Sequence, residues 1–308
     1  MNILYSRSAS DARSARPLLL IHGGAGPRST ELALQTEKDY RRGLLAALEA
    51  GRHVLEGGQS ALDGVCAAVV ALEDNPLFNA GCGASLTECG SAEMDAAVMT
   101  GDGQAGAVAV SRYARNPVLA ARAVMEQTDH VLMVGPGIDL VDRWGLRREP
   151  TSYFVTDHRL RQLDSVLAQR QKAARHGTVG AVAIDAAGAV ACATSTGGMV
   201  GQSVGRVGDT GLIGAGSFAG WDTAAISCTG EGEAFIKGVV AHDIASRIRH
   251  GGASLHDAVH ATYERELDGR GATGGSIALT PDGQALIAHN SKAMFAGYWD
   301  GERTEAFV

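Results

Sequence analysis

The stretch GTVGAVA, residues 177–183, marks the sharpest change of character in this sequence. Residues 151–177 form the most polar long segment, rich in Arg, Gln, Asp and Lys, and this composition predicts a surface linker. From Thr178 the chain becomes apolar, and a second apolar run follows the turn sequence Asp185-Ala186-Ala187-Gly188. Two such runs around a glycine-containing turn predict a β-hairpin in which 178–184 pairs with 190–196.

Further elements are predicted on both sides of this hairpin. The expected strands are 18–21, 105–111, 130–134, 212–216, 224–228, 276–279 and 285–288. The expected helices are 31–55, one capped by Ser60 with Asp63 as its partner, one opened by Asn116-Pro117, 231–249 and 254–267. The first sixteen residues are expected to be a frayed tail. Because strands and helices come in separate blocks, a layered α+β fold with two sheets between helix layers is favoured over a doubly wound sheet.

The composition limits the partners that this chain can have. Its 308 residues carry 27 Lys and Arg against 34 Asp and Glu, with no basic block, so neither nucleic acid nor an anionic membrane surface is an expected partner. No apolar run approaches the roughly 18 residues of a membrane span, and no secretory signal is indicated. Five cysteines without a CxxC pair argue against a disulfide framework and favour a reducing, cytoplasmic location. A small-molecule substrate is therefore expected.

One motif suggests an esterase. Gly201-Gln202-Ser203-Val204-Gly205 matches G-x-S-x-G, with Ser203 as the nucleophile, and His22-Gly23-Gly24 is similar to an esterase oxyanion loop. A nucleophile elbow needs a strand before the serine and a helix after it. Neither is predicted around Ser203, so this motif is weak.

Two further patterns are weaker still. His256 and His260 have the i, i+4 spacing of a helical metal pair, but the glutamate of H-E-x-x-H and a third ligand are missing, so a solvated helix face is expected. The glycine loop 22–26 has neither G-x-G-x-x-G spacing nor a G-K-[ST] ending, so it predicts no phosphate site.

Several short motifs accompany the GTVGAVA stretch. They are Phe78-Asn79-Ala80-Gly81, Met94-Asp95-Ala96, Ala193-Thr194-Ser195-Thr196-Gly197-Gly198, Gly205-Arg206-Val207-Gly208-Asp209 and Ser227-Cys228-Thr229-Gly230. With every motif in order from His22 to about Trp299, the sequence resembles the plant-type L-asparaginase and isoaspartyl peptidase family of N-terminal nucleophile hydrolases. The resemblance implies a four-layer αββα sandwich.

The resemblance also implies that the chain cuts itself. A threonine inside a chain is a poor nucleophile, whereas a threonine at a new chain start has its own α-amine, with a pKa of about 7.7–8.0, as a nearby base. Cleavage between Gly177 and Thr178 would create that start. It would give an α chain of residues 1–177, ending in the polar linker, and a β chain of residues 178–308. Family members pair these chains as (αβ)2 dimers.

The catalytic residues of the family carry over onto matching positions. Thr178 would be the nucleophile, and Thr196 would hydrogen-bond its hydroxyl. The Thr229 hydroxyl and the Gly230 N–H would form the oxyanion hole. Asn79 is expected near the nucleophile.

The substrate-binding residues carry over in the same way. Arg206 would bind the α-carboxylate and Asp209 the α-ammonium group of the substrate, with Gly230 and the Gly232 carbonyl in the same pocket. No catalytic cofactor is expected. The loop 72–82 resembles the family's sodium-binding loop, in which the ligands would be the backbone carbonyls of Leu72, Glu73, Asn75, Phe78, Ala80 and Cys82.

The implied reaction is the hydrolysis of β-aspartyl amide bonds, in isoaspartyl dipeptides and in L-asparagine, through a β-aspartyl ester on Thr178. The preference between these substrates is left open. The related glycosylasparaginases have Asp before the threonine, and Gly177 argues against that branch. Two alternatives remain at this point, an esterase that uses Ser203 and a non-catalytic binding protein with the same fold.

Overall fold

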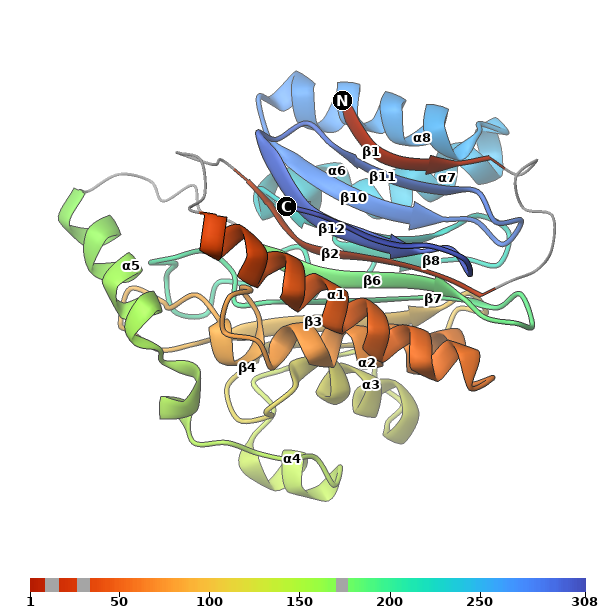
Figure 1. Cartoon of the computed structure of the whole chain (residues 1–308). Helices are drawn as coiled ribbons and strands as arrows, with labels where there is room; N and C mark the ends of the chain where they lie inside the picture. Colours follow the sequence, from red (N-terminus) through yellow and green to blue (C-terminus); the bar gives the residue numbers. More distant parts are fainter. Residues whose placement is uncertain (9–16, 27–33, 170–176) are drawn as a thin grey trace.

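Two β-sheets lie face to face between two layers of helices (Figure 1). The computed structural model describes residues 1–8, 17–26, 34–169 and 177–308. Apolar side chains fill three interfaces, one between the sheets and one between each sheet and its helices. The αββα arrangement predicted from the sequence is confirmed.

The larger sheet has the strand order β13-β12-β2-β6-β7-β3-β4-β5, and all its neighbouring strands are antiparallel except β4 and β5. The strands are β2 (Leu18–Gly26), β3 (Met94–Thr100), β4 (Ala105–Ser111), β5 (Leu132–Val134), β6 (Thr178–Ile184), β7 (Val190–Thr196), β12 (Ala293–Trp299) and β13 (Thr304–Phe307). The predicted central hairpin, β6 and β7, has the predicted bounds. Its register places Thr178 opposite Thr196.

The smaller sheet has the strand order β1-β11-β10-β9-β8 and is antiparallel throughout. Its strands are β1 (Asn2–Arg7), β8 (Ser217–Ala219), β9 (Ala225–Gly230), β10 (Gly274–Leu279) and β11 (Ala285–His289). Between the sheets, Leu20, Val182 and Ile277 are wholly buried in one apolar cluster. This packing fixes the end of β9 close to the start of β6.

The outer face of the larger sheet is covered by α1 (Leu34–Glu56), α2 (Ala61–Glu73) and α3 (Pro117–Gln127) (Figure 1). The start of α2 is as predicted, because the Ser60 side chain accepts from the Asp63 N–H and the Asp63 side chain accepts from the Ser60 N–H. The short helix α4 (Ile138–Arg143) follows β5.

The outer face of the smaller sheet is covered by α6 (Gly232–Gly238), α7 (Val240–Gly251) and α8 (Leu255–Thr262). A π-helical turn, Tyr263–Leu267, and a 3-10 turn, Asp268–Arg270, continue α8. Tyr263 is wholly buried here, and its hydroxyl contacts Ser276 on β10 at 2.9 Å.

Three predicted elements differ from the structure. The helix expected over 231–249 is interrupted at Val239, whose left-handed backbone conformation (φ 46°) separates α6 from α7. Residues 212–216 form turns instead of a strand, and the pairing starts only at β8. The expected N-terminal tail contains β1, because residues 2–7 pair with the edge of β11, while residues 9–16 lie outside the described part.

The polar segment 151–177 also differs from the expected linker. It contains a 3-10 turn, Thr151–Phe154, and the helix α5 (Asp157–Gln169), while residues 170–176 lie outside the described part. Phe154 and Leu163 pack against Val200 in a small apolar cluster. A few buried side chains in a mostly polar sequence are thus enough to fix this helix to the sandwich.

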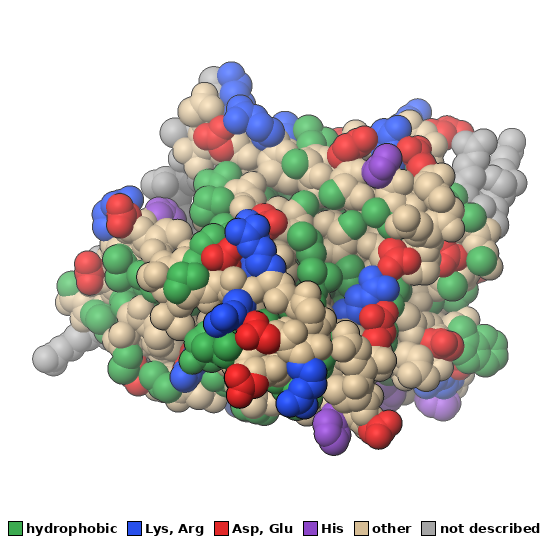
Figure 2. Space-filling model, turned by 90° about the horizontal axis from the view of Figure 1, so that it is seen from below, with side chains coloured by type: hydrophobic (Ala, Val, Ile, Leu, Met, Phe, Trp, Pro, Cys, Tyr) green, Lys and Arg blue, Asp and Glu red, His purple; other side chains and the backbone are tan. Residues whose placement is uncertain are grey.

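The surface carries mixed charges. Figure 2 shows Lys and Arg side chains interspersed with Asp and Glu over the face seen from below. On α3, Arg122 pairs with Asp63 and Glu126 at 2.7 Å each. Within the described residues, no helix combines the length and the hydropathy that crossing a membrane requires.

Candidate active site

Thr178, the first residue of β6, lies in a hydrogen-bonded cluster. Its hydroxyl donates to the Thr196 hydroxyl oxygen at 3.2 Å, and that oxygen also accepts from the Gly198 N–H at 3.0 Å. The Thr196 hydroxyl in turn donates to the carbonyl oxygen of Gly177 at 3.4 Å. Thr196 therefore connects the hydroxyl of Thr178 with the carbonyl group of the residue before it.

Thr229 and Gly230, at the end of β9, face the same point. The Thr229 hydroxyl oxygen accepts from the Thr178 N–H at 3.3 Å and from the Ala25 N–H at 3.2 Å. Two accepted bonds occupy both lone pairs, so the hydroxyl proton is left to donate. Gly230 has φ 146°, and a Cβ there would lie 2.5 Å from the Gly274 Cα, so only glycine fits this position.

His22 on β2 holds the backbone of Thr178. Burial lowers the pKa of His22 to about 3, so the imidazole is neutral. Its Nδ1 donates to the Thr178 carbonyl at 2.8 Å, which leaves Nε2 to accept from the Ser227 hydroxyl at 2.8 Å. In the sequence, His22 stands out only as the start of a glycine loop. Thr178 lies 156 positions further along the chain, so the contact could not be predicted.

Arg206 lies on the loop before β8 with its side chain 16% exposed. Its Nε and Nη2 both approach one carboxylate oxygen of Glu233 at 2.9 Å, and Nη1 donates to the Gln202 Oε1 at 3.1 Å. The Glu233 side chain is 55% exposed, and an ion pair this accessible to water is weak. An incoming carboxylate can therefore replace Glu233 at the guanidinium fork.

Asp209 is buried close to Arg206. Burial raises the pKa of its carboxyl to about 7, and among the described residues its Oδ2 has no hydrogen-bond partner. A Cβ on Gly232 would lie 2.8 Å from the Asp209 Oδ1 and 3.0 Å from the Arg206 Nη2, so the glycine lets both charged groups approach the start of α6. The unpartnered oxygen suits a ligand that brings a positive charge and N–H donors.

This burial predicts a pH-dependent effect of Asp209→Asn on stability. The folded-state pKa is raised above the ordinary value of 3.8, so the folded chain binds the extra proton between about pH 4 and pH 7 and loses stability as the pH rises through that interval. Asparagine does not ionise. Urea unfolding measures the free energy of unfolding of Asp209→Asn and of the wild type at each pH. We expect the difference, variant minus wild type, to rise by about 1–3 kcal/mol when the pH is raised from 5 to 8.

Asp222→Asn is the control for this measurement. The pKa of Asp222 is lowered by its hydrogen bonds to Arg249, so this carboxyl is ionised at both pH values in the folded and the unfolded chain. Its effect should not change between pH 5 and pH 8. A constant effect of Asp209→Asn over the same interval would mean that Asp209 does not titrate as a buried group.

Two acidic residues beside β3 hold the loop that carries Arg206 and Asp209. Glu93 accepts from the Gly205 N–H at 2.7 Å, and Asp95 accepts from the Gly208 N–H at 2.8 Å. Burial raises the pKa of Asp95 to about 6. Asp95 belonged to a motif used in the sequence analysis, but a positioning function was not predicted for it or for Glu93.

Most of the predicted catalytic and substrate-binding residues line one pocket. It is lined by Gly177, Thr178, Thr196, Gly198, Met199, Arg206, Gly208, Asp209, Gly230 and Gly232. Thr229 adjoins it through Thr178. Asn79 lies behind the lining residue Gly198. Its Nδ2 donates to the Gly198 carbonyl at 2.7 Å, and its Oδ1 accepts from the Ser85 N–H at 2.6 Å. Asn79 therefore supports the turn that donates to Thr196.

The loop expected to bind sodium winds tightly on itself. The Asn75 N–H donates to the Leu72 carbonyl, the Phe78 N–H to that of Asn75 and the Gly83 N–H to that of Ala80. The Leu72 carbonyl also accepts from the Asp74 N–H, whereas the Asn75 and Ala80 carbonyls accept one of these bonds each. The Glu73 side chain is wholly buried, and burial raises its pKa to about 8. It adds no full negative charge near neutral pH.

The competing motifs do not form sites of the kinds they suggested. Ser203 is exposed in a turn, with neither a strand before it nor a helix after it. His256 and His260 are exposed on α8 with parallel rings 6.3 Å apart, as a solvated helix face predicts. No group of three or more His, Cys, Asp and Glu residues in the described ranges could hold a metal ion.

A sandwich of this layering, in which a threonine opens a central strand inside a polar pocket, defines the class of N-terminal nucleophile hydrolases. The family model described as Asparaginase matches residues 15–308. An isoaspartyl peptidase of Escherichia coli K12 is 43% identical over 300 residues, covering 92% of each chain. An isoaspartyl peptidase/L-asparaginase of Xenopus laevis is 40% identical over 285 residues, covering 91% of each chain. The chain belongs to the asparaginase family.

Proposed function

We propose that this chain is an isoaspartyl peptidase and L-asparaginase that matures by cleavage before Thr178. The observation that carries the proposal is the position of the Thr196 hydroxyl, which accepts from the Thr178 hydroxyl and donates to the Gly177 carbonyl. Arg206 and Asp209 line the same pocket as this pair, so a nucleophile lies beside a site for a zwitterion. The membership of the asparaginase family supports the same reaction.

Maturation uses the groups around the Gly177 carbonyl. The Thr178 hydroxyl attacks that carbonyl carbon, the bond to the Thr178 nitrogen breaks, and the nitrogen takes up the proton. The resulting ester between Gly177 and the Thr178 side chain is opened by water. The products are a carboxylate on Gly177 and a free α-amine and hydroxyl on Thr178.

Turnover repeats this chemistry on a substrate. The free α-amine of Thr178 accepts the proton of its own hydroxyl, and the oxygen attacks the β-carbonyl of the aspartyl unit. The Thr229 hydroxyl and the Gly230 N–H stabilise the oxyanion, a contribution of roughly 2.7–4 kcal/mol for each donor. The leaving amine departs with a proton, and water hydrolyses the β-aspartyl ester to release aspartate.

Recognition depends on two charged groups of the substrate. Arg206 binds the α-carboxylate with its fork, and Asp209 accepts from the α-ammonium group with the oxygen that has no partner among the described residues. Both groups must be free, so the aspartyl unit is N-terminal and joined through its side-chain carbonyl. This requirement excludes ordinary α-peptides.

The proposal predicts which dipeptides are cut. The matured enzyme should hydrolyse β-Asp-Leu, whereas α-Asp-Leu and N-acetyl-β-Asp-Leu should react at least about 100-fold more slowly, because each lacks one of the free groups that Arg206 and Asp209 bind. L-Asparagine should be the slower or weaker-binding substrate, since it lacks the contacts of a leaving-group side chain. Amino acid release, followed by chromatography, gives kcat/KM for each compound. Comparable turnover of the α- and β-linked dipeptides would show that this pocket is wrongly assigned.

The assembly of the mature enzyme belongs to the same proposal. Residues 1–177 and 178–308 would remain together as α and β chains and pair as an (αβ)2 dimer. A structural sodium ion held by the carbonyls of the 72–82 loop would stiffen the segment that carries Asn79. The five free cysteines suit a cytoplasmic location.

A further inference from the structure

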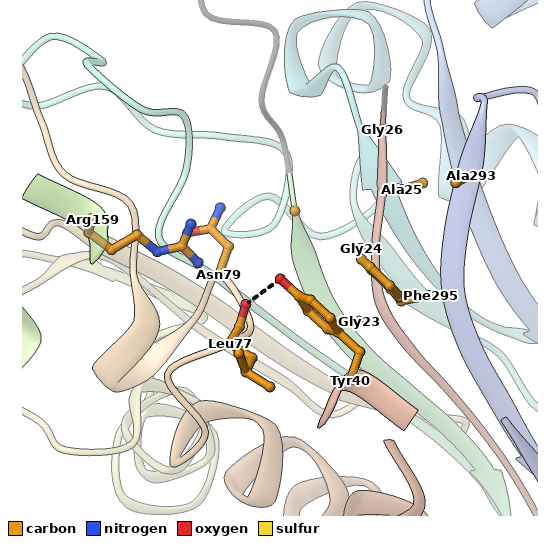
Figure 3. Close-up of a pocket in the computed structure, with 11 residues that line it drawn as sticks. Gly23, Gly24, Ala25, Gly26, Tyr40, Leu77, Asn79, Arg159, Ala293 and Phe295 are labelled. Atoms are coloured by element: carbon orange, nitrogen blue, oxygen red, sulfur yellow. Dashed lines mark hydrogen bonds between the residues drawn. The ribbon is translucent and has the colours of Figure 1, made fainter. Parts of the chain in front are cut away.

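A second pocket lies on the other side of Gly177 from Arg206 and Asp209. Gly177 lines both pockets, and the second is also lined by residues 23–26 and by Tyr40, Leu77, Asn79, Arg159 and Phe295. Figure 3 shows Arg159 and Asn79 on one side of it and Tyr40 and Phe295 on the other. The rings of Tyr40 and Phe295 stack at 4.3 Å. Among the described lining residues, Arg159 is the one charged side chain, and it faces an apolar wall.

Arg159 is a buried cation. Its side chain reaches inward from α5, and the residue is only 7% exposed. Its Nε donates to the Gly83 carbonyl at 2.6 Å and its Nη1 to the Gln162 Oε1 at 2.8 Å. Both partners are neutral. Within the described residues no carboxylate pairs with it.

An arginine in this position needs an anion. The guanidinium keeps its charge in proteins, so a buried cation with no carboxylate partner among the described residues is unfavourable until an anion binds. Burial lowers the pKa of Arg159, as expected for a cation that lacks a counter-charge. A carboxylate that enters the pocket would meet an already positioned planar donor group.

We propose that this pocket binds the leaving amino acid of an isoaspartyl dipeptide, with Arg159 receiving its C-terminal carboxylate. The proposal rests on the proposed function, because the aspartyl unit must occupy the pocket of Arg206 and Asp209. The scissile bond then lies at Thr178, and the leaving group extends past the position of Gly177. Tyr40, Leu77 and Phe295 offer contact to an apolar side chain. L-Asparagine releases ammonia and has no carboxylate to place here.

The test compares Arg159→Gln with Arg161→Gln, which changes an exposed arginine on the same helix. Each matured enzyme is assayed with β-Asp-Leu, β-Asp-leucinamide and L-asparagine. For Arg159→Gln we expect kcat/KM for β-Asp-Leu to fall about 10- to 100-fold, mainly through KM, because a hydrogen bond to a charged group is lost. Hydrolysis of L-asparagine should change less than about threefold. Arg161→Gln should behave as the wild type with all three substrates.

The amide substrate makes the same test without a mutation. The wild type should hydrolyse β-Asp-leucinamide about 10- to 100-fold less efficiently than β-Asp-Leu, and Arg159→Gln should abolish this difference, since both changes remove one contact. Cleavage of each variant is checked on a denaturing gel. If Arg159→Gln fails to mature, Arg159→Lys is assayed in its place. Because lysine retains the charge, this variant should keep part of the difference in kcat/KM between β-Asp-Leu and β-Asp-leucinamide.

Three results would overturn this inference. Equal losses on β-Asp-Leu and L-asparagine would make Arg159 a structural residue. Equal rates of wild-type enzyme on the acid and the amide would show that no cation receives the carboxylate. Discrimination that persists in Arg159→Gln would assign the carboxylate to another group. A wild type that matures but cuts no β-aspartyl bond would instead refute the proposed function.

Discussion

Thr178→Ala should remain a single chain of 31.8 kDa and should hydrolyse no β-aspartyl substrate, with activity at least about 10⁴-fold below that of the wild type. The wild type should separate on a denaturing gel into fragments of 177 and 131 residues, with masses of about 18 and 14 kDa. The reason is that one hydroxyl performs both reactions. It donates to the Thr196 hydroxyl oxygen, and the Thr196 hydroxyl donates to the Gly177 carbonyl, so the Thr178 hydroxyl is connected to the bond that is cut.

Two variants complete this experiment. Thr178→Ser retains the hydroxyl and should still cut itself, more slowly. Ser203→Ala removes the exposed serine of the G-x-S-x-G motif and should mature and hydrolyse β-Asp-Leu like the wild type. Intact wild-type chain after long incubation, or two fragments from Thr178→Ala, would contradict the assignment of the nucleophile.

Arg206→Lys should mature normally and lose at least about 100-fold in kcat/KM for β-Asp-Leu. Lysine keeps the positive charge but presents one ammonium group in place of the planar fork that binds a carboxylate with two parallel hydrogen bonds. Maturation should continue because the contacts of Arg206 go to Glu233 and Gln202 and not to Gly177 or Thr178. Band intensities and steady-state kinetics measure the two effects separately.

Arg249→Lys is a matched control, since Arg249 also forms a forked pair, with both carboxylate oxygens of Asp222 at 2.7 Å. It lies outside both pockets described above. This variant should show wild-type kinetics. If Arg206→Lys also does, the substrate carboxylate must bind elsewhere.

The sequence predicted the centre of the fold, and most of the candidate site residues that it indicated line one pocket in the structure. The β6–β7 hairpin was predicted with its observed bounds because both strands are apolar throughout and the turn between them contains Asp and Gly. Residues near each other in the chain, such as Arg206 and Asp209, also needed no knowledge of the fold. Their common pocket with Thr178 agrees with the arrangement that the resemblance implied.

Contacts between distant segments could not be predicted in this way. Three residues, His22, Glu93 and Arg159, each hydrogen-bond a loop or strand that is far away in sequence. The local sequence around each of them does not indicate such a contact. Arg159 is the clearest case, because its polar neighbours suggested a linker. The interruption at Val239 was missed for a different reason, since a valine in a left-handed conformation leaves no local signal.

The strand order of the larger sheet determines what a cut at Gly177 does to the molecule. Strand β2 comes from the first 177 residues, yet it lies between β12 and β6, which come from the remainder, and β7 pairs on its far side with β3 from the first part. Strands of the first fragment therefore lie between and beside strands of the second fragment within one sheet. Separating the fragments would break the interstrand hydrogen bonds along entire strands. The cleaved protein should therefore still unfold as one cooperative unit. Hydrolysis at this bond changes the number of chains and leaves the hydrodynamic size as it was.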